Sequence, residues 1–74
     1  MITIIKTNNP VTLSFAQSVL NDSRIGSFVA DQNISILEGS IGVLAKRLMV
    51  LADDEFAARR ALKLAGLGKE LYEA

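Results

Sequence analysis

The opening ten residues place a strand directly before a helix, and this junction constrains the fold more than any other part of the chain. Residues 2–7 (Ile-Thr-Ile-Ile-Lys-Thr) are rich in β-branched side chains and predict a strand. Neighbouring Ile4 and Ile5 are expected to point to opposite sides of this strand, which makes both of its faces apolar. Asn9 is a good helix N-cap and Pro10 suits the first helical position, so a helix should begin there.

Strands and helices are expected to alternate along the rest of the chain. The further predicted elements are a helix over 10–23, strands over 27–30 and 46–51, and a second helix capped by Asp53 and Gly66. Each helix carries one apolar arc, which should face the core. The residues of these arcs are Leu13, Phe15, Ala16, Val19 and Leu20, and then Ala57, Ala58, Ala61, Leu62, Leu64 and Ala65. The second helix is expected to expose Arg59, Arg60 and Lys63.

The order β-α-β-loop-β-α predicts an α+β fold. Right-handed crossovers would place both helices on one face of a mainly antiparallel sheet, as in a ferredoxin-like two-layer sandwich. The strands near 2–7 and 46–51 should then be neighbours. We expect a single domain over residues 1–66 and a tail over 67–74 that forms a short strand or a frayed helix.

The composition argues against several classes of function. The 74 residues contain no cysteine and no histidine, and acidic and basic residues are equal in number. A small domain without disulfides suits a reducing compartment, so we expect a cytoplasmic protein. A zinc site of the usual ligands is excluded, and a neutral chain is atypical of nucleic-acid binders. The apolar runs are also too short to span a bilayer, so no membrane partner is expected. No metal, cofactor or nucleic-acid partner is expected either.

Several short segments follow one another in a distinctive order. They are Thr7-Asn8-Asn9-Pro10, Phe28-Val29-Ala30-Asp31, Leu37-Glu38-Gly39, Arg47-Leu48-Met49-Val50, and Asp53-Asp54 before an alanine- and arginine-rich helix. Their order and spacing over residues 2–66 resemble a bacterial family of unknown function, described as signal-transducing proteins. The resemblance implies a ferredoxin-like fold similar to that of the nitrogen-regulatory signal proteins. It supplies no catalytic or ligand residues, and the zinc-ribbon cysteines that some relatives append are absent.

The long connection between the second and third strands is the candidate functional segment. It exceeds what a turn requires, and long loops in compact domains are often functional. The candidate ligand- or partner-binding residues are Asp31, Gln32, Asn33, Glu38, Gly39, Ser40, Gly42 and Arg47. Gly39 and Gly42 would let backbone amides approach a ligand closely. An equally compatible interpretation is a loop that only covers the sheet.

Two motifs in this segment lack residues that the corresponding binding sites require. Asp31 begins a pattern of alternate oxygen ligands, but Ile36 and Gly42 occupy the positions where a calcium loop needs glycine and glutamate. The Gly-x-x-Gly pattern of residues 39–42 follows Glu38 and lacks the basic neighbours of a nucleic-acid clamp. The basic side chains of the second helix are best explained as a solvated face.

Three functions remain open on the sequence alone. The first is a regulatory module that binds a small ligand or a protein. The second is a structural subunit, since an uncovered apolar sheet face predicts self-association, most simply as a homodimer. The third is an enzyme that uses Asp, Ser and Lys, although the commonest general base and thiol nucleophile are absent. No residue is singled out as catalytic, and we expect that the protein is not an enzyme.

Overall fold

The computed structural model describes residues 1–31 and 46–73 of the chain. Its elements are the strands β1 (Ile2–Thr7), β2 (Phe28–Asp31) and β3 (Lys46–Val50), the α-helices α1 (Pro10–Asp22) and α2 (Glu55–Leu64), and the 3-10 helices η1 (Ala52–Asp54) and η2 (Gly68–Glu70). The predicted strands and the first helix agree with these bounds to within one residue at each end. No helix in the described part of the chain is long and apolar enough to cross a membrane.

The junction between β1 and α1 forms as predicted. The Asn9 side-chain oxygen accepts hydrogen bonds from the backbone amides of Val11 at 2.9 Å and Thr12 at 3.4 Å. These amides have no partner inside the helix, so the cap satisfies donors that would otherwise remain open. Pro10 occupies the first turn, where its missing amide hydrogen costs nothing.

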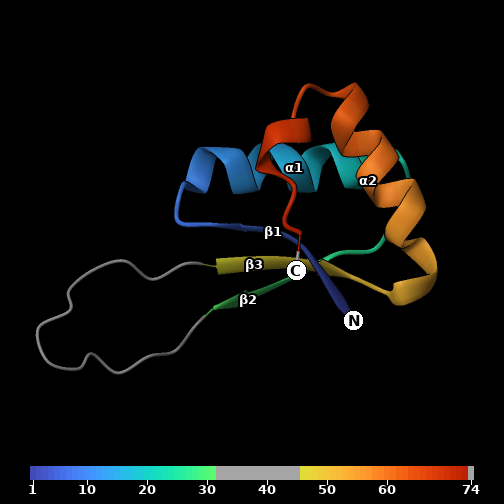
Figure 1. Cartoon of the computed structure of the whole chain (residues 1–74), viewed down its shortest axis with the longest axis horizontal. Helices are drawn as coiled ribbons and strands as arrows, with labels where there is room; N and C mark the ends of the chain where they lie inside the picture. The colour runs from blue at the N-terminus through green and yellow to red at the C-terminus, as the bar shows by residue number, and fades with distance from the viewer. Residues whose placement is uncertain (32–45, 74) are drawn as a thin grey trace, which may run out of the picture.

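The sheet has the order β1-β3-β2, with antiparallel pairing on both sides of the central strand β3 (Figure 1). The predicted neighbourhood of the first and third strands is therefore confirmed. Ile2 pairs with Val50 at one end of β1, and Thr7 pairs with Lys46 at the other.

A β-bulge overturns one prediction for β1. Thr3 pairs with Met49 and Ile5 pairs with the next residue, Leu48, so Ile4 is an extra residue in the ladder. Ile4 and Ile5 are both fully buried in the same core, with 0% exposure. The expectation that they point to opposite faces was wrong, because the bulge breaks the alternation of side chains. The face of the sheet that is turned away from the helices therefore carries one large apolar residue fewer than predicted.

The two helices lie over the same side of the sheet in Figure 1, and α1 and α2 contact one another and β1. The core between these layers consists of Ile4, Ile5, Leu13, Ala16, Leu20, Ile25, Leu48, Val50, Ala58, Leu62 and Leu67. The result is a small α+β fold with an antiparallel sheet, compatible with a ferredoxin-like fold.

The start of α2 differs from the prediction. Asp53 does not cap the helix, because residues 52–54 form the 3-10 helix η1, in which the amide of Asp54 donates to the carbonyl of Leu51 at 2.9 Å. Asp54 takes the N-cap position, but its side chain makes no capping hydrogen bond. The hydrogen bond at this turn is therefore made by backbone groups, whereas the sequence predicted a bond to the carboxylate of Asp53.

The buried stripe of α2 is narrower than predicted. Ala58 and Leu62 are fully buried, whereas Ala57 is exposed and Leu64 is 80% exposed. Leu64 follows Leu62 by two residues, which is a rotation of about 200° around a helix, so the two side chains lie on opposite sides. Phe15 of α1 is also about half exposed, contrary to the prediction.

Both α-helices end in the same hydrogen-bond pattern. After α2, the amide of Gly66 donates to the carbonyl of Lys63 at 3.0 Å and that of Leu67 to Leu62 at 2.9 Å. Gly66 has a φ of 89°, so the predicted glycine end is confirmed. After α1, Arg24 takes the equivalent position with a φ of 61°, which is costly for a residue with a side chain.

The chain after Gly66 packs back onto the domain. Leu67 is buried in the core, η2 follows, and Leu71 forms an antiparallel bridge with Ile5. The amide of Tyr72 donates to the carbonyl of Ile4 at 2.6 Å. The tail therefore contacts β1 at the edge that β3 leaves unpaired, and Figure 1 shows it running from η2 to the sheet.

Candidate functional site

The candidate loop joins the ends of two neighbouring strands. Asp31, the last residue of β2, pairs with Lys46, the first residue of β3, so residues 32–45 begin and end at positions that are paired in the sheet. Of the candidate residues, Gln32, Asn33, Glu38, Gly39, Ser40 and Gly42 lie outside the described residues. Arg47 follows Lys46 on β3 and so lies next to the end of the strand at which the loop is attached.

Arg47 lies in the middle of the sheet, between two edge strands. Its cross-strand neighbours are Lys6 on β1 and Ala30 on β2. The side chain is partly buried, and within residues 1–31 and 46–73 its Nε has no hydrogen-bond partner although it is shielded from water. A buried donor without an acceptor is unfavourable, so this nitrogen is suited to receive an acceptor from a ligand.

The face of the sheet that carries Arg47 is turned away from the core. Leu48 and Val50 are buried under the helices, and side chains alternate along a strand, so Arg47 and Met49 lie on the opposite face. Cross-strand partners share a face. The residues of this face, called the open face below, are Thr3, Lys6, Phe28, Ala30, Arg47 and Met49.

The open face combines two cations with apolar side chains. Lys6 and Arg47 are adjacent, and the six residues include no carboxylate. Phe28 is 53% exposed next to Met49. The Lys6 ammonium also lies 5.8 Å from the centre of the Tyr72 ring, within the range of a cation–π contact. Such a surface can bind a ligand that has both an anionic group and a flat apolar group. The two cations would bind the anionic group, and the apolar side chains would contact the flat group.

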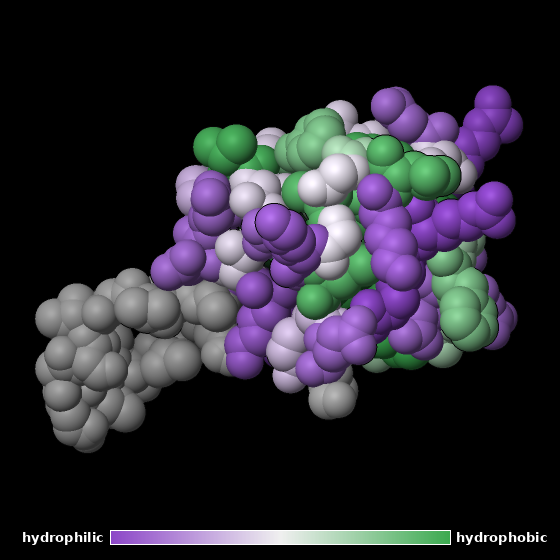
Figure 2. All heavy atoms as spheres, turned by 45° about the horizontal axis from the view of Figure 1, so that its top comes forward, coloured by the Kyte–Doolittle hydropathy of each residue, from purple (hydrophilic) through white to green (hydrophobic). Residues whose placement is uncertain are grey.

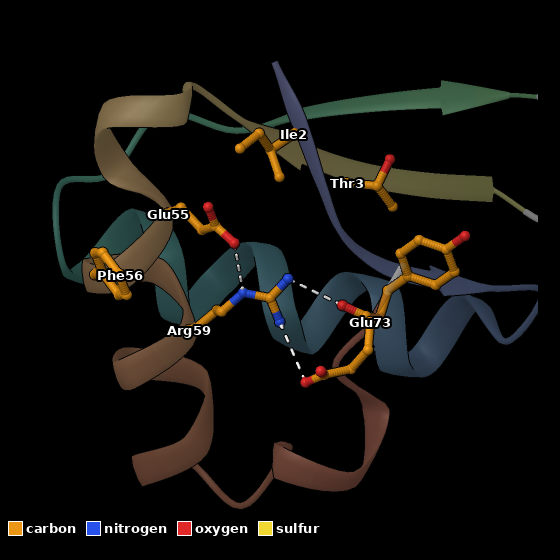
Figure 3. A pocket seen from close by; sticks show the side chains of 7 residues that line it. Ile2, Thr3, Glu55, Phe56, Arg59 and Glu73 are labelled. Carbon is orange, nitrogen blue, oxygen red and sulfur yellow. Dashed lines mark hydrogen bonds and ion pairs between the residues drawn. The ribbon is translucent and has the colours of Figure 1, made fainter.

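A second concave region lies between β1, α2 and the tail (Figure 3). It has a volume of about 570 Å³ and contains the guanidinium of Arg59. Arg59 Nε donates to Glu55 at 3.0 Å, Nη2 donates to the carbonyl of Tyr72 at 2.9 Å, and Nη1 lies 3.9 Å from a Glu73 carboxylate oxygen.

These contacts correct the expectation for Arg59. Its side chain is only 21% exposed, so it does not belong to the solvated face of α2. Two carboxylates already neutralise the guanidinium, and an anionic ligand would have to approach against them. We therefore assign Arg59 the role of fastening the tail to α2. The sequence offered only the four-residue spacing from Glu55 as a signal of this role.

The outer side of α2 is a third feature that sequence reasoning missed. Arg60 and Lys63 are exposed as expected, but Phe56 and Leu64 stand beside them, at 87% and 80% exposure. Hydrophobic and hydrophilic residues are intermixed over the side of the molecule that Figure 2 shows. The spacing of Phe56, Arg60 and Leu64, each four residues apart, places them along one line of the helix and could have revealed this surface.

All three phenylalanines of the chain are exposed, one each on α1, β2 and α2 (Phe15, Phe28 and Phe56). Aromatic side chains usually contribute strongly to a core. Single exposed apolar residues are common on protein surfaces, so Phe28 and Phe56 are informative only together with their neighbours Met49 and Leu64. In the described part of the chain, no group of three or more acidic residues is placed to hold a metal ion.

The fold is a small α+β domain with exposed apolar and basic side chains on α2 and an exposed phenylalanine on the sheet. The chain belongs to the family described as "putative prokaryotic signal transducing protein", whose model matches residues 1–66. The resemblance found in the sequence is thereby confirmed, and the family description points to a role in signalling. A search of curated proteins finds no match.

Proposed function

We propose that this protein is a regulatory binding module that recognises a small anionic ligand on its open face, and that it does not catalyse a reaction. Arg47 carries the proposal. Its guanidinium lies on the central strand, and its Nε lacks an acceptor among the described residues. A phosphate or carboxylate of a ligand would supply that acceptor in a charge-assisted hydrogen bond.

The neighbours of Arg47 support a ligand with an apolar or aromatic part. Lys6 adds a second positive charge across the β1–β3 pair. Phe28 and Met49 form an apolar patch next to the two cations. Nucleotides combine a phosphate with a flat ring, so they are the first class of ligand to test.

We also infer that the fold is ferredoxin-like in full. The bridge between Leu71 and Ile5 supports this inference, because a fourth strand of that fold would lie beside β1. The β-α-β-β-α-β pattern of that fold requires such a last strand after the second helix. In this arrangement both helices cover one face of the sheet and leave the open face free for a ligand.

Thermal unfolding with a panel of nucleotides and inorganic phosphate tests the proposed function. A ligand that binds only the folded protein stabilises it by about 2.7 kcal/mol at a concentration of one hundred times its Kd. Arg47→Met should abolish the rise in Tm, whereas the matched variant Lys46→Met, on the same strand, should retain it. The proposal would be contradicted if ligands raised the Tm of Arg47→Met as much as that of the wild type. It would also be contradicted if no anion raised the Tm of the wild type.

A second copy of the chain is a competing occupant of the open face. Phe28 and Met49 would then lie at the centre of a homodimer interface. Sedimentation of the wild type and of Phe28→Lys separates the two cases, since a dimer through this face should dissociate in the variant. A monomer over the whole concentration range favours the ligand. Turnover of a bound nucleotide, measured as product, would instead favour an enzyme.

A further inference from the structure

The solvent side of α2 carries large apolar side chains that take no part in the core. Its residues, called the α2 outer face below, are Phe56, Arg60, Lys63 and Leu64. Ala58 and Leu62 fix the opposite side of the helix in the core. Phe56 and Leu64 therefore cannot turn inward without pulling Ala58 and Leu62 out, and their exposure follows from the orientation of α2.

A groove of about 410 Å³ runs beside the α2 outer face, between α2 and the end of α1. Ile25 and Ala61 contribute apolar surface to its lining, and Phe56 and Leu64 line it from α2. Arg60 also lines the groove, whereas no carboxylate does. The groove is thus lined mainly by apolar side chains, and Ser23 and the cation Arg60 are its polar residues.

The charges near the groove are unevenly distributed along α2. Arg60 and Lys63 lie in its C-terminal half, and neither appears in an ion pair among the described residues. Glu55, at the N-terminal end, is bound to Arg59 on another side of the helix. Asp53 and Asp54 also precede Phe56. An acidic partner is therefore attracted to the C-terminal half of α2 and repelled from its start.

The outer side of α1 is apolar but lacks this charge. Val11 and Phe15 are exposed there, one turn apart, among the uncharged side chains of Ser14 and Ser18. Both helices therefore show apolar residues to the surroundings. Only α2 combines them with cations and a groove.

We propose that the α2 outer face docks an acidic amphipathic helix of a partner protein, with its apolar residues in the groove and its carboxylates over Arg60 and Lys63. The ten residues of α2 span about 15 Å, which matches a partner segment of two to three turns. This mode of recognition places large side chains of one helix into an apolar groove. The site lies on the helix layer, apart from the open face, so the module would have one surface for a ligand and another for a protein.

The experiment uses a synthetic three-turn amphipathic peptide with leucines along one face and glutamates elsewhere. Its binding to the full chain is followed by NMR amide shifts, with a peptide in which lysines replace the glutamates as control. We expect shifts at residues 56–64 and around Ile25, and weaker binding of the lysine peptide by about tenfold or more.

Matched variants assign the contact to specific side chains. Phe56→Ala should weaken binding of the glutamate peptide by about tenfold or more, whereas Phe28→Ala, an exposed phenylalanine on the sheet, should not. Arg60→Glu with Lys63→Glu should reverse the preference between the two peptides, and Lys46→Glu should leave it unchanged. All of these side chains are largely exposed, so the variants are expected to fold.

Three results would overturn the proposal. The first is equal affinity for the glutamate and lysine peptides. The second is a pattern of shifts centred on the open face. The third is an equal loss of binding in Phe56→Ala and Phe28→Ala, which would indicate nonspecific contact with exposed aromatic rings.

Discussion

Arg59 Nη2 donates a hydrogen bond of 2.9 Å to the carbonyl oxygen of Tyr72 and so connects α2 to the C-terminal tail. The same guanidinium is oriented by Glu55, one turn earlier on the helix. The amide of Tyr72 in turn donates to Ile4 on β1. One residue of the tail is thus held from both sides, by the helix layer and by the edge of the sheet.

Replacing Arg59 by methionine keeps an unbranched apolar stem and removes these hydrogen bonds. The free energy of unfolding should fall by about 1–3 kcal/mol, because hydrogen bonds to charged groups are stronger than neutral ones and this site is partly shielded. Urea unfolding measures the change. Arg60→Met, next to it and exposed, should shift the value by no more than about 0.5 kcal/mol. Equal losses in both variants would show that charge, and not the contact with the tail, is responsible.

Two leucines on α2 provide a test of the packing. Leu62→Ala should reduce the free energy of unfolding by about 2–5 kcal/mol, since it removes a fully buried side chain and leaves a cavity. Leu64→Ala makes the same chemical change at a site that is 80% exposed, and should cost about 0.5 kcal/mol or less. Circular dichroism during urea unfolding gives both values. A larger loss at Leu64 would mean that α2 is rotated from the orientation described.

Gly66 is expected to resist substitution. Its φ of 89° is unfavourable for any side chain, so Gly66→Ala should cost about 1–2 kcal/mol. Gly26→Ala is the control, since an added methyl group there would meet no atom within 4 Å. Thermal unfolding compares the two, and a Tm for Gly66→Ala equal to that of Gly26→Ala would argue against the left-handed end of α2.

A substitution at Arg24 is expected to stabilise the protein. It occupies the position after α1 that Gly66 occupies after α2, with a φ of 61°. Arg24→Gly should raise the free energy of unfolding by about 0.5–1 kcal/mol through relief of backbone strain. Arg24→Ala keeps the strain and removes the charge, so its value should stay close to that of the wild type. A gain in Arg24→Ala of the same size would attribute the effect to the lost charge.

The N-cap of α1 can be isolated with a neighbouring pair of asparagines. Asn9→Ala removes the acceptor of the Val11 and Thr12 amides and should cost about 1 kcal/mol. Asn8 is exposed and makes no capping bond, so Asn8→Ala should be nearly neutral. Chemical denaturation resolves this difference, and equal effects would remove Asn9 from its role.

Features that depend on a few consecutive residues were predicted well. Asn9 and Pro10 specify the start of α1 through their own backbone and side-chain chemistry. The same local reasoning was wrong for Asp53, because a 3-10 helix precedes α2. Gly66 ends α2 for a similarly local reason. The pairing of β1 with β3 was also predicted, because the order of strands and helices leaves few connections that are right-handed.

Features that depend on distant contacts were missed. The bulge at Ile4 is set by pairing with β3, which no pattern in residues 2–7 reveals. Arg59 is shielded by the tail, which joins it from thirteen residues away. For the candidate site, the sequence placed Arg47 beside the loop, but its position between Lys6 and Ala30 required the strand register.

The attachment of the tail has a consequence for the behaviour of the protein at high concentration. In the described sheet β1 is an outermost strand, and its β-branched segment would be a template for intermolecular strand addition if its free edge were bare. The bridge from Leu71 and the bond from Tyr72 occupy part of that edge. A chain shortened after Gly68, which keeps the buried Leu67 but loses Leu71 and Tyr72, should therefore form fibrils or insoluble assemblies more readily than the intact protein.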